Sequence, residues 1–129
     1  MKVFIVEDSP ALVQAVSDLL SEIDGVEIAG STGVVERATE EIRRLRPDIV
    51  ILDIRLADGS GLDVLRNIKS RTSDAPLVIV FSSNTEPGYR RACERLGADF
   101  VFDKSQDYNK LPEVIRSKVS SINSGSEGK

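Results

Sequence analysis

Five short, almost uninterrupted apolar runs recur along the 129-residue chain, and a stretch with helical periodicity follows each of them. Strands that are apolar on both faces are typical of a parallel sheet covered by helices on both sides. Five strand–helix repeats are too few for a closed eight-stranded barrel. They therefore predict an α/β fold, a doubly wound (βα)5 five-stranded parallel sheet in a three-layer sandwich with right-handed crossovers. The runs are residues 3–6, 26–30, 48–52, 77–81 and 100–102.

The segments between these runs carry the start and stop signals of helices. Ser9 and Pro10 predict the N-cap and the first position of a helix that ends at Asp24-Gly25. A second helix is expected to bury a stripe that begins at Val34 and to stop before Pro47, because a residue that precedes proline disfavours the helical conformation. Two short helices are expected to begin near Gly61 and near Pro87.

The last helix is less regular in the sequence. Pro112 inside a helix would leave a backbone carbonyl unpaired, so we expect the regular helix from about Leu111 to about Ser121, after an irregular turn at 105–110. Small polar residues follow it. We therefore expect one domain over residues 1–121 and a flexible polar tail over 122–129.

Composition excludes several classes of site. The chain has no histidine, which rules out a Ser-His-Asp or Cys-His hydrolase and a histidine-ligated zinc. Cys93 is the sole cysteine, so neither an internal disulfide nor a multi-cysteine metal site can form. The net charge is −4 and the basic residues are dispersed, so we expect no contact of this domain with nucleic acid. Neither a membrane span nor a secretory signal is visible, and we expect a cytoplasmic location without membrane contact.

Polar side chains follow four of the five predicted strands. In an open parallel sheet, ligands bind beyond the carboxyl ends of the strands, so these side chains are expected to converge. Three carboxylates close together repel one another by about 3 to 4 kcal/mol per pair, which predicts a bound cation. Oxygen ligands without cysteine or histidine favour Mg²⁺. The strand-end residues are Glu7-Asp8, Asp53, Ser82-Ser83 and Asp103-Lys104.

An aspartate beside a cation, a hydroxyl and an ammonium group is suited to accept a phosphoryl group, since those three groups can hold the phosphoryl oxygens. Each residue alone has a simpler explanation. Glu7 and Asp8 could interact with a helix dipole, Ser82 could be a loop hydroxyl, and Lys104 could be a solvated surface charge. Their joint occurrence at strand ends favours the phosphoacceptor interpretation, with Asp53 as the acceptor.

These residues stand in motifs that resemble the response-regulator receiver domain of the chemotaxis-protein type, a module of two-component signalling. The resemblance covers roughly residues 2–121 and rests on four stretches in family order: VEDS, ILDIRLADGSGLDVL, VFSSN and GADFVFDK. It implies a flavodoxin-like sheet with strand order 2-1-3-4-5.

The resemblance also implies a role for each site residue. Asp53 would take a phosphoryl group from a phosphohistidine of a sensor histidine kinase or phosphotransfer protein. Asp8, Asp53 and the backbone carbonyl of Arg55 would bind Mg²⁺ directly, and Glu7 would act through a bound water. Ser82 and Lys104 would hold the phosphoryl group and bias a two-state equilibrium of the loop after the fourth strand.

The same resemblance implies the output of the switch. The fourth helix, the fifth strand and the last helix would present a changed surface to a downstream effector protein, or to an output domain lost from the sequence. Such a module is not an enzyme beyond catalysing its own phosphorylation and dephosphorylation.

The chain departs from the family pattern at four places, and two of them are Glu7, where aspartate is more common, and Ala57, where proline is frequent. Val101 stands where the switch aromatic is usual, three residues before the lysine. Ser105 replaces the common proline after Lys104, and we expect a trans bond there because a cis bond before a non-proline residue costs about 3 to 4 kcal/mol. The switch hydroxyl is expected at Ser82, which follows the apolar run directly, with Ser83 as the alternative.

Three other functions fit this sequence less well. An aspartyl phosphatase of the haloacid-dehalogenase type needs a second aspartate where this chain has Arg55. A flavodoxin needs a hydroxyl-rich phosphate loop after the first strand, where Glu7 and Asp8 would repel phosphate. A pseudo-receiver adaptor that works without phosphorylation is the alternative disfavoured by the intact Asp8, Asp53 and Lys104.

Overall fold

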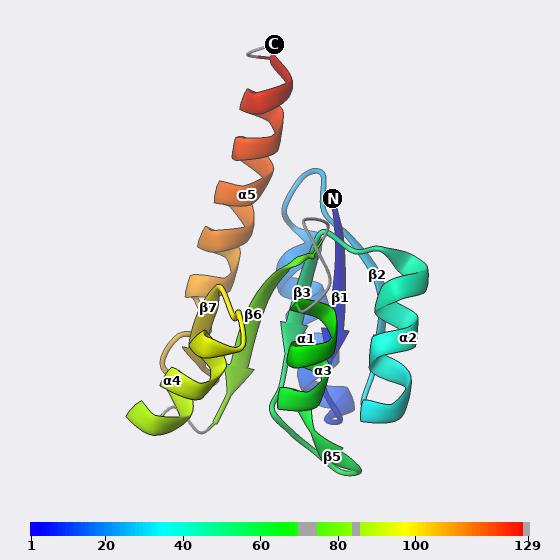
Figure 1. Ribbon diagram of the computed structural model, residues 1–129. Helices are drawn as coiled ribbons and strands as arrows, with labels where there is room; N and C mark the ends of the chain where they lie inside the picture. Colours follow the sequence, from blue (N-terminus) through cyan, green and yellow to red (C-terminus); the bar gives the residue numbers. More distant parts are fainter. Residues whose placement is uncertain (70–74, 84–85, 128–129) are drawn as a thin grey trace.

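The main sheet has five parallel strands in the order expected from the sequence. The computed structural model describes residues 1–69, 75–83 and 86–127. Its strands lie in the order β2-β1-β3-β6-β7 (Figure 1), which is 2-1-3-4-5 when the five strands of this sheet are counted along the chain. The doubly wound parallel fold is therefore confirmed. The strands are β1 (Lys2–Val6), β2 (Glu27–Thr32), β3 (Ile49–Leu52), β6 (Leu77–Ser82) and β7 (Phe100–Asp103).

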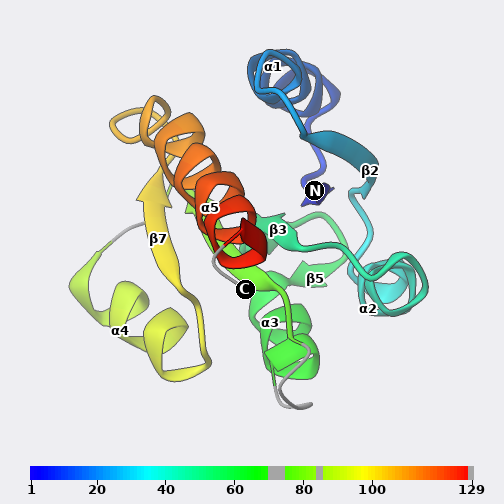
Figure 2. The same cartoon turned by 90° about the horizontal axis from the view of Figure 1, so that it is seen from above.

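Helices cover both faces of this sheet, as the apolar strands require. The helices are α1 (Pro10–Ser21), α2 (Val35–Leu45), α3 (Gly61–Lys69), α4 (Pro87–Arg95) and α5 (Lys110–Glu127). Viewed from above, α1 and α5 lie on one side of the sheet and α2, α3 and α4 on the other (Figure 2). Two cores match these layers, because buried residues of α2, α3 and α4 cluster with one face of the strands and those of α1 and α5 with the other.

A small second sheet, which was not predicted from the sequence, lies between β3 and α3 along the chain. It consists of β4 (Arg55–Leu56) and β5 (Gly59–Ser60), which pair antiparallel across a tight turn. Figure 1 shows this hairpin at the end of the molecule toward which β1 points, below the carboxyl ends of the main strands. The chain that leaves Asp53 therefore makes a hairpin before it enters α3.

The start of α1 matches its sequence signals, whereas the start of α2 does not. Ser9 caps α1 by accepting a hydrogen bond from the Leu12 amide at 3.3 Å, and Pro10 is the first helical residue. Val34 was expected on the buried stripe of the second helix. It is instead the N-cap residue of α2 and is 38% exposed, because the apolar stripe begins one residue later.

The last helix is longer than expected. It begins at Lys110, close to the expected start, but it continues to Glu127, well beyond the expected end near Ser121. Neither proline nor glycine occurs between Ser121 and Gly125, and ordinary polar residues reduce helix propensity only slightly. The C-terminal part of α5 projects past the sheet at the end opposite the hairpin (Figure 1). The division into a domain of residues 1–121 and a flexible tail stays a prediction.

Within the described ranges, no helix is both long enough and apolar enough to cross a bilayer.

Candidate functional site

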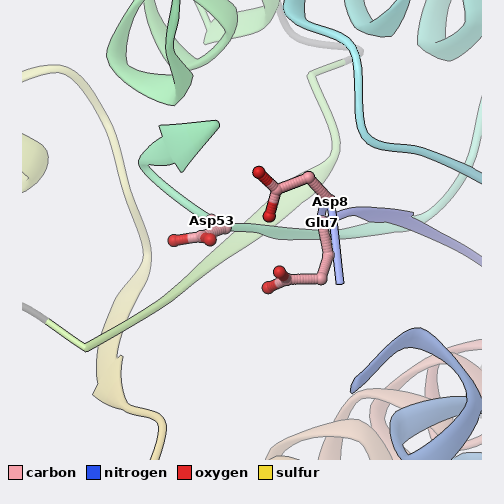
Figure 3. Close-up of side chains that lie close together, drawn as sticks. All are labelled: Glu7, Asp8 and Asp53. Atoms are coloured by element: carbon pink, nitrogen blue, oxygen red, sulfur yellow. The ribbon is translucent and has the colours of Figure 1, made fainter. Parts of the chain in front are cut away.

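Three carboxylates meet where β1 and β3 end. These strands are neighbours in the sheet, so Glu7 and Asp8, which follow β1, come close to Asp53, which follows β3. One oxygen from each carboxylate lies within 4.8 Å of the other two, and Figure 3 shows the three groups gathered at one place. Glu7 and Asp53 are buried, with 7% and 5% exposure, whereas Asp8 is exposed. The predicted convergence of the acids is confirmed.

The strand ladder continues into these acids and fixes their backbone. The Glu7 amide donates to the Thr32 carbonyl at 2.9 Å, and the Asp53 amide donates to the Val6 carbonyl at 2.9 Å. Because both bonds belong to the rigid sheet, the acids are held close together by main-chain pairing despite their like charges.

Lys104 joins this cluster from the end of β7. Its ammonium nitrogen lies 2.9 Å from Oε1 of Glu7 and 3.0 Å from Oδ2 of Asp53. Its amide donates to the Ser82 carbonyl at 3.0 Å, which ties the lysine to the neighbouring strand β6. One ammonium group faces three carboxylates, so the cluster keeps an excess of negative charge when all four groups are ionised.

The ionisation of the cluster follows from burial and from this pairing. Burial of the carboxyl group raises the pKa of Glu7 above its usual value; the hydrogen bond from Lys104 opposes this shift, and the charge of Asp53 adds to it. Burial alone would lower the pKa of Lys104, but its bonds to Glu7 and Asp53 outweigh that effect and raise it. The lysine is therefore cationic at neutral pH.

The donor set fits a hard divalent cation. It offers carboxylate oxygens only, without sulfur or nitrogen ligands, and such oxygens are the ligands that Mg²⁺ prefers. At 4.8 Å two carboxylates repel by about 3 kcal/mol at an effective dielectric constant near 20. Lys104 compensates one charge and a divalent ion would compensate the other two. The residues that could hold such an ion are Glu7, Asp8 and Asp53.

Arg55 lies two residues beyond Asp53 on β4 with an exposed side chain. Its amide donates to Oδ1 of Asp53 in a long contact of 3.4 Å, so its backbone belongs to the surroundings of the acceptor. The use of its carbonyl as a metal ligand remains a prediction.

Of the two adjacent serines, Ser82 has the position expected of the switch hydroxyl. It is the last residue of β6, is 1% exposed, and lies opposite Asp103 in the ladder between β6 and β7. Ser83 is outside the strand and exposed. The role of Ser82 stays a prediction, and residues 84–85 of the loop expected to switch lie outside the described residues.

The departures from the family pattern are visible on β7. Val101 is buried, whereas Phe100 and Phe102 lie on the opposite face with their ring centroids 5.5 Å apart. No cis peptide bond occurs in the described ranges, so the expected trans bond between Lys104 and Ser105 is confirmed.

Two carboxylates shape the loop that carries Lys104, a role that was not predicted from the sequence. Asp103 Oδ1 accepts hydrogen bonds from the Ser105 amide at 2.8 Å, the Ser105 hydroxyl at 2.7 Å and the Gln106 amide at 3.0 Å. Asp107 Oδ2 accepts from the Asp103 amide at 2.8 Å. Aspartates that bond amides two or three residues away form compact turns, and this local pattern was the available signal.

Two glycines permit the close approach of backbones at the site. A side-chain carbon at Gly33 would lie 2.7 Å from the Cα of Asp8, and one at Gly61 would collide with the carbonyl of Asp53. From the sequence, Gly61 was identified only as a helix start and as part of the receiver motif, and Gly33 was missed. A glycine three residues after the predicted end of the second strand was the signal available for it.

Comparison with known proteins decides the family. Residues 3–116 match the model of the response regulator receiver domain. The chain belongs to this family. Its curated relatives include a protein-glutamate methylesterase/protein-glutamine glutaminase of Methanococcoides burtonii, 31% identical over 95% of this chain and 36% of that protein. Another is the DNA-binding transcriptional activator DevR/DosR of Mycobacterium tuberculosis, 33% identical over 67% of this chain and 40% of that protein. The receiver chain thus spans little more than a third of these relatives.

Solved structures agree with the receiver fold. A DNA-binding response regulator of the LuxR family from Staphylococcus aureus superposes with a TM-score of 0.81 at 28% identity, over 90% of this chain and 96% of that chain. The CheX-CheY-BeF3-Mg+2 complex from Borrelia burgdorferi has a chain that superposes with a TM-score of 0.81 at 25% identity, over 92% of this chain and 89% of that chain.

Proposed function

We propose that this receiver domain accepts a phosphoryl group on Asp53 in a Mg²⁺-dependent reaction and thereby switches a partner-binding surface. The observation that carries the proposal is the meeting of Glu7, Asp8 and Asp53 within 4.8 Å, with Lys104 bonded to Glu7 and Asp53. Family membership supports it.

The donor would be the phosphohistidine of a sensor histidine kinase or phosphotransfer protein, because the chain has no histidine of its own. A carboxylate oxygen of Asp53 would form a bond to phosphorus while the phosphorus–nitrogen bond of the donor breaks. The electron pair of that bond stays on the imidazole, and Asp53 becomes an acyl phosphate. Mg²⁺, held by Asp8 and Asp53 with Glu7 and the Arg55 carbonyl nearby, would supply positive charge for the phosphoryl oxygens.

Lys104 and Ser82 would respond to the new group. The lysine ammonium now bonds Asp53 Oδ2 at 3.0 Å and would transfer to a phosphoryl oxygen, since charge-assisted hydrogen bonds to phosphate are strong. The Ser82 hydroxyl, at the buried end of β6, would donate to another. Each new bond pulls on a strand end, and the loop after β6 would shift its equilibrium.

The output of this shift would be a changed surface formed by α4, β7 and α5. The binding partner would be a downstream effector protein, or an output domain such as those implied by the greater length of the relatives. We infer that the domain's own chemistry is limited to gaining and losing the phosphoryl group.

The test is labelling with a small phosphodonor, phosphoramidate, and Mg²⁺, followed by intact-mass measurement. We expect one base-labile phosphoryl group on the wild type and on the control Asp63→Asn, whose exposed carboxylate pairs with Arg66 on the surface of α3. We expect none on Asp53→Asn and none with EDTA. Equal labelling of Asp53→Asn, or labelling that persists with EDTA, would contradict the proposal.

A second experiment tests the switch hydroxyl. Ser82→Ala should still be labelled but should lose the phosphorylation-dependent chemical-shift changes of β7 and α4, whereas Ser83→Ala should keep them. The opposite result would move the switch role from Ser82 to Ser83.

A further inference from the structure

The hairpin that follows Asp53 is fastened to a distant helix by one carboxylate. Asp58, in the turn between β4 and β5, accepts a hydrogen bond from the Val35 amide at 2.9 Å and a longer one of 3.5 Å from the Glu36 amide. These amides are the first two of α2. The bond to Val35 lowers the pKa of Asp58 below its usual range, so the side chain is a carboxylate at neutral pH.

This contact replaces the local cap that α2 lacks. Among the described residues, Val34 at the N-cap makes no side-chain hydrogen bond to the helix, whereas Ser9 at the start of α1 caps its own helix. Helix N-termini need acceptors for their free amides, and a serine or aspartate at the cap position supplies one locally. In α2 the acceptor comes instead from 23 residues along the chain.

The backbone just before α2 also contacts Asp8, the member of the acidic cluster that follows β1. A side-chain carbon at Gly33 would lie 2.7 Å from the Cα of Asp8, so the backbone just before α2 packs directly on Asp8. The Gly59 Cα faces Val35, since a side-chain carbon there would lie 3.5 Å from its methyl group. The start of α2 therefore lies between Asp8 on one side and the hairpin on the other.

We propose that Asp58 is a positioning residue for the acidic cluster: by bonding the start of α2, it holds the hairpin that begins at Arg55 in register with Asp8. Asp53 directly follows β3, and the backbone beyond it is held by the hydrogen bond from the Gly61 amide to the Ile54 carbonyl and by the short β4–β5 pairing. Both of these contacts lie within the loop itself, whereas the bond of Asp58 joins the loop to α2. A cation site that uses Asp8 from β1 and backbone from the hairpin needs both at a set separation. The inference rests on the proposed Mg²⁺ binding of this site.

The first measurement is the Mg²⁺ dissociation constant, determined by calorimetry on the full chain without phosphodonor. We expect Asp58→Ala to bind about tenfold more weakly than the wild type, as for the loss of an outer contact to a metal site. Asp58→Asn keeps an acceptor oxygen and should recover most of the affinity although it removes the same charge. Asp63→Ala, which removes a nearby exposed charge on α3, should bind as the wild type does.

The second measurement separates positioning from simple helix capping. Asp58→Ala should lower Tm by about 3 to 5 °C, the shift expected for loss of one cap in a domain of this size. The double variant Val34→Ser/Asp58→Ala gives α2 a local cap at an exposed position. We expect it to regain Tm and to keep the weak Mg²⁺ binding, because the new cap does not reach the hairpin.

The outcomes distinguish this inference from the proposed function. If the double variant regains both Tm and affinity, Asp58 is only a cap and the positioning role is wrong. It is equally wrong if the wild type binds Mg²⁺ and Asp58→Ala binds it as tightly. If the wild type itself does not bind Mg²⁺, the proposed function fails, and this inference fails with it.

Discussion

The two loops that flank the acidic cluster are held in different ways. The loop after β3 carries the hairpin of β4 and β5 and is fastened to α2 through Asp58. The loop after β7 carries Lys104 and is closed on itself, since Asp103 and Asp107 bond amides within the same short segment. One loop is held by a remote element and the other by its own residues.

This difference separates two requirements of the site. The loop after β3 must be aligned with Asp8, which belongs to another strand, so a contact that spans elements is useful. Lys104 is already aligned by its amide bond to Ser82 in the sheet, and its loop needs only a compact turn. Perturbations of the first loop should therefore reach the acids, whereas those of the second should stay local.

The largest effect is expected in the loop after β3. Gly61→Ala places a carbon against the Asp53 carbonyl and 2.9 Å from the Cα of Ile54. Neither backbone can move without disturbing β3, so we expect a loss of about 3 kcal/mol in the free energy of unfolding, measured by urea denaturation. Gly88→Ala is the matched control, because a carbon there meets nothing within 4 Å among the described residues. It should be neutral or stabilising, and an equal loss in both variants would contradict the explanation.

A smaller effect is expected from the loop after β7, which is held by its own residues. Asp103→Ala removes the acceptor of three hydrogen bonds from Ser105 and Gln106, which should cost about 1 to 2 kcal/mol of unfolding free energy. Asp103→Asn should retain part of it. Because the turn is local, Mg²⁺ affinity should change far less than in Asp58→Ala. Equal losses of affinity in the two variants would show that the loops are not held differently.

Acid titration compares the carboxylates that fasten the two loops. The Val35 amide lowers the pKa of Asp58, and the Asp103 amide lowers that of Asp107. A carboxyl group with a lower pKa in the folded chain stabilises the fold above its unfolded pKa, near 4, and loses this contribution as the pH falls through the folded pKa. The stability deficits of Asp58→Asn and Asp107→Asn should therefore be full above about pH 5 and shrink in acid. Deficits that persist unchanged at low pH would contradict this.

The smallest effect is expected at the surface of the loop after β7. Lys110 pairs with Asp107 at 3.0 Å and lies 6.0 Å from the centroid of the Phe102 ring, but its side chain is 58% exposed. Lys110→Gln should lower the unfolding free energy by at most about 0.5 kcal/mol. High salt should abolish most of the difference. A larger, salt-independent loss would mean that the loop depends on this ion pair rather than on its backbone bonds.

The sequence predicted what depends on pattern and order. The apolar runs defined the strands, and the acids at their ends predicted the cluster, because neighbouring parallel strands bring their carboxyl ends together. Glu7, Asp8, Asp53 and Lys104 were found in this way, and the structure brings them together.

What the sequence did not reveal depends on contacts between distant segments. Asp58-Gly59 is a turn signal, but nothing local indicates that its carboxylate bonds Val35. Gly33 is one of nine glycines, and only the packing on Asp8 distinguishes it. The end of α5 was misjudged for another reason, since the polar residues after Ser121 have propensities too similar to those of helical ones to define a boundary.

Because α5 is long, a small tilt at its packed end moves its far end by a larger distance. A helix of 18 residues is about 27 Å long, and its first turns pack in the core through Leu111 and Ile115 while its far part projects past the sheet (Figure 1). A tilt of about 5° at the packed base displaces the tip by roughly 2 Å, as follows from the rise per residue. A small rearrangement beside Lys104, near the packed end of α5, would therefore produce a larger displacement at the end of the helix that extends past the sheet.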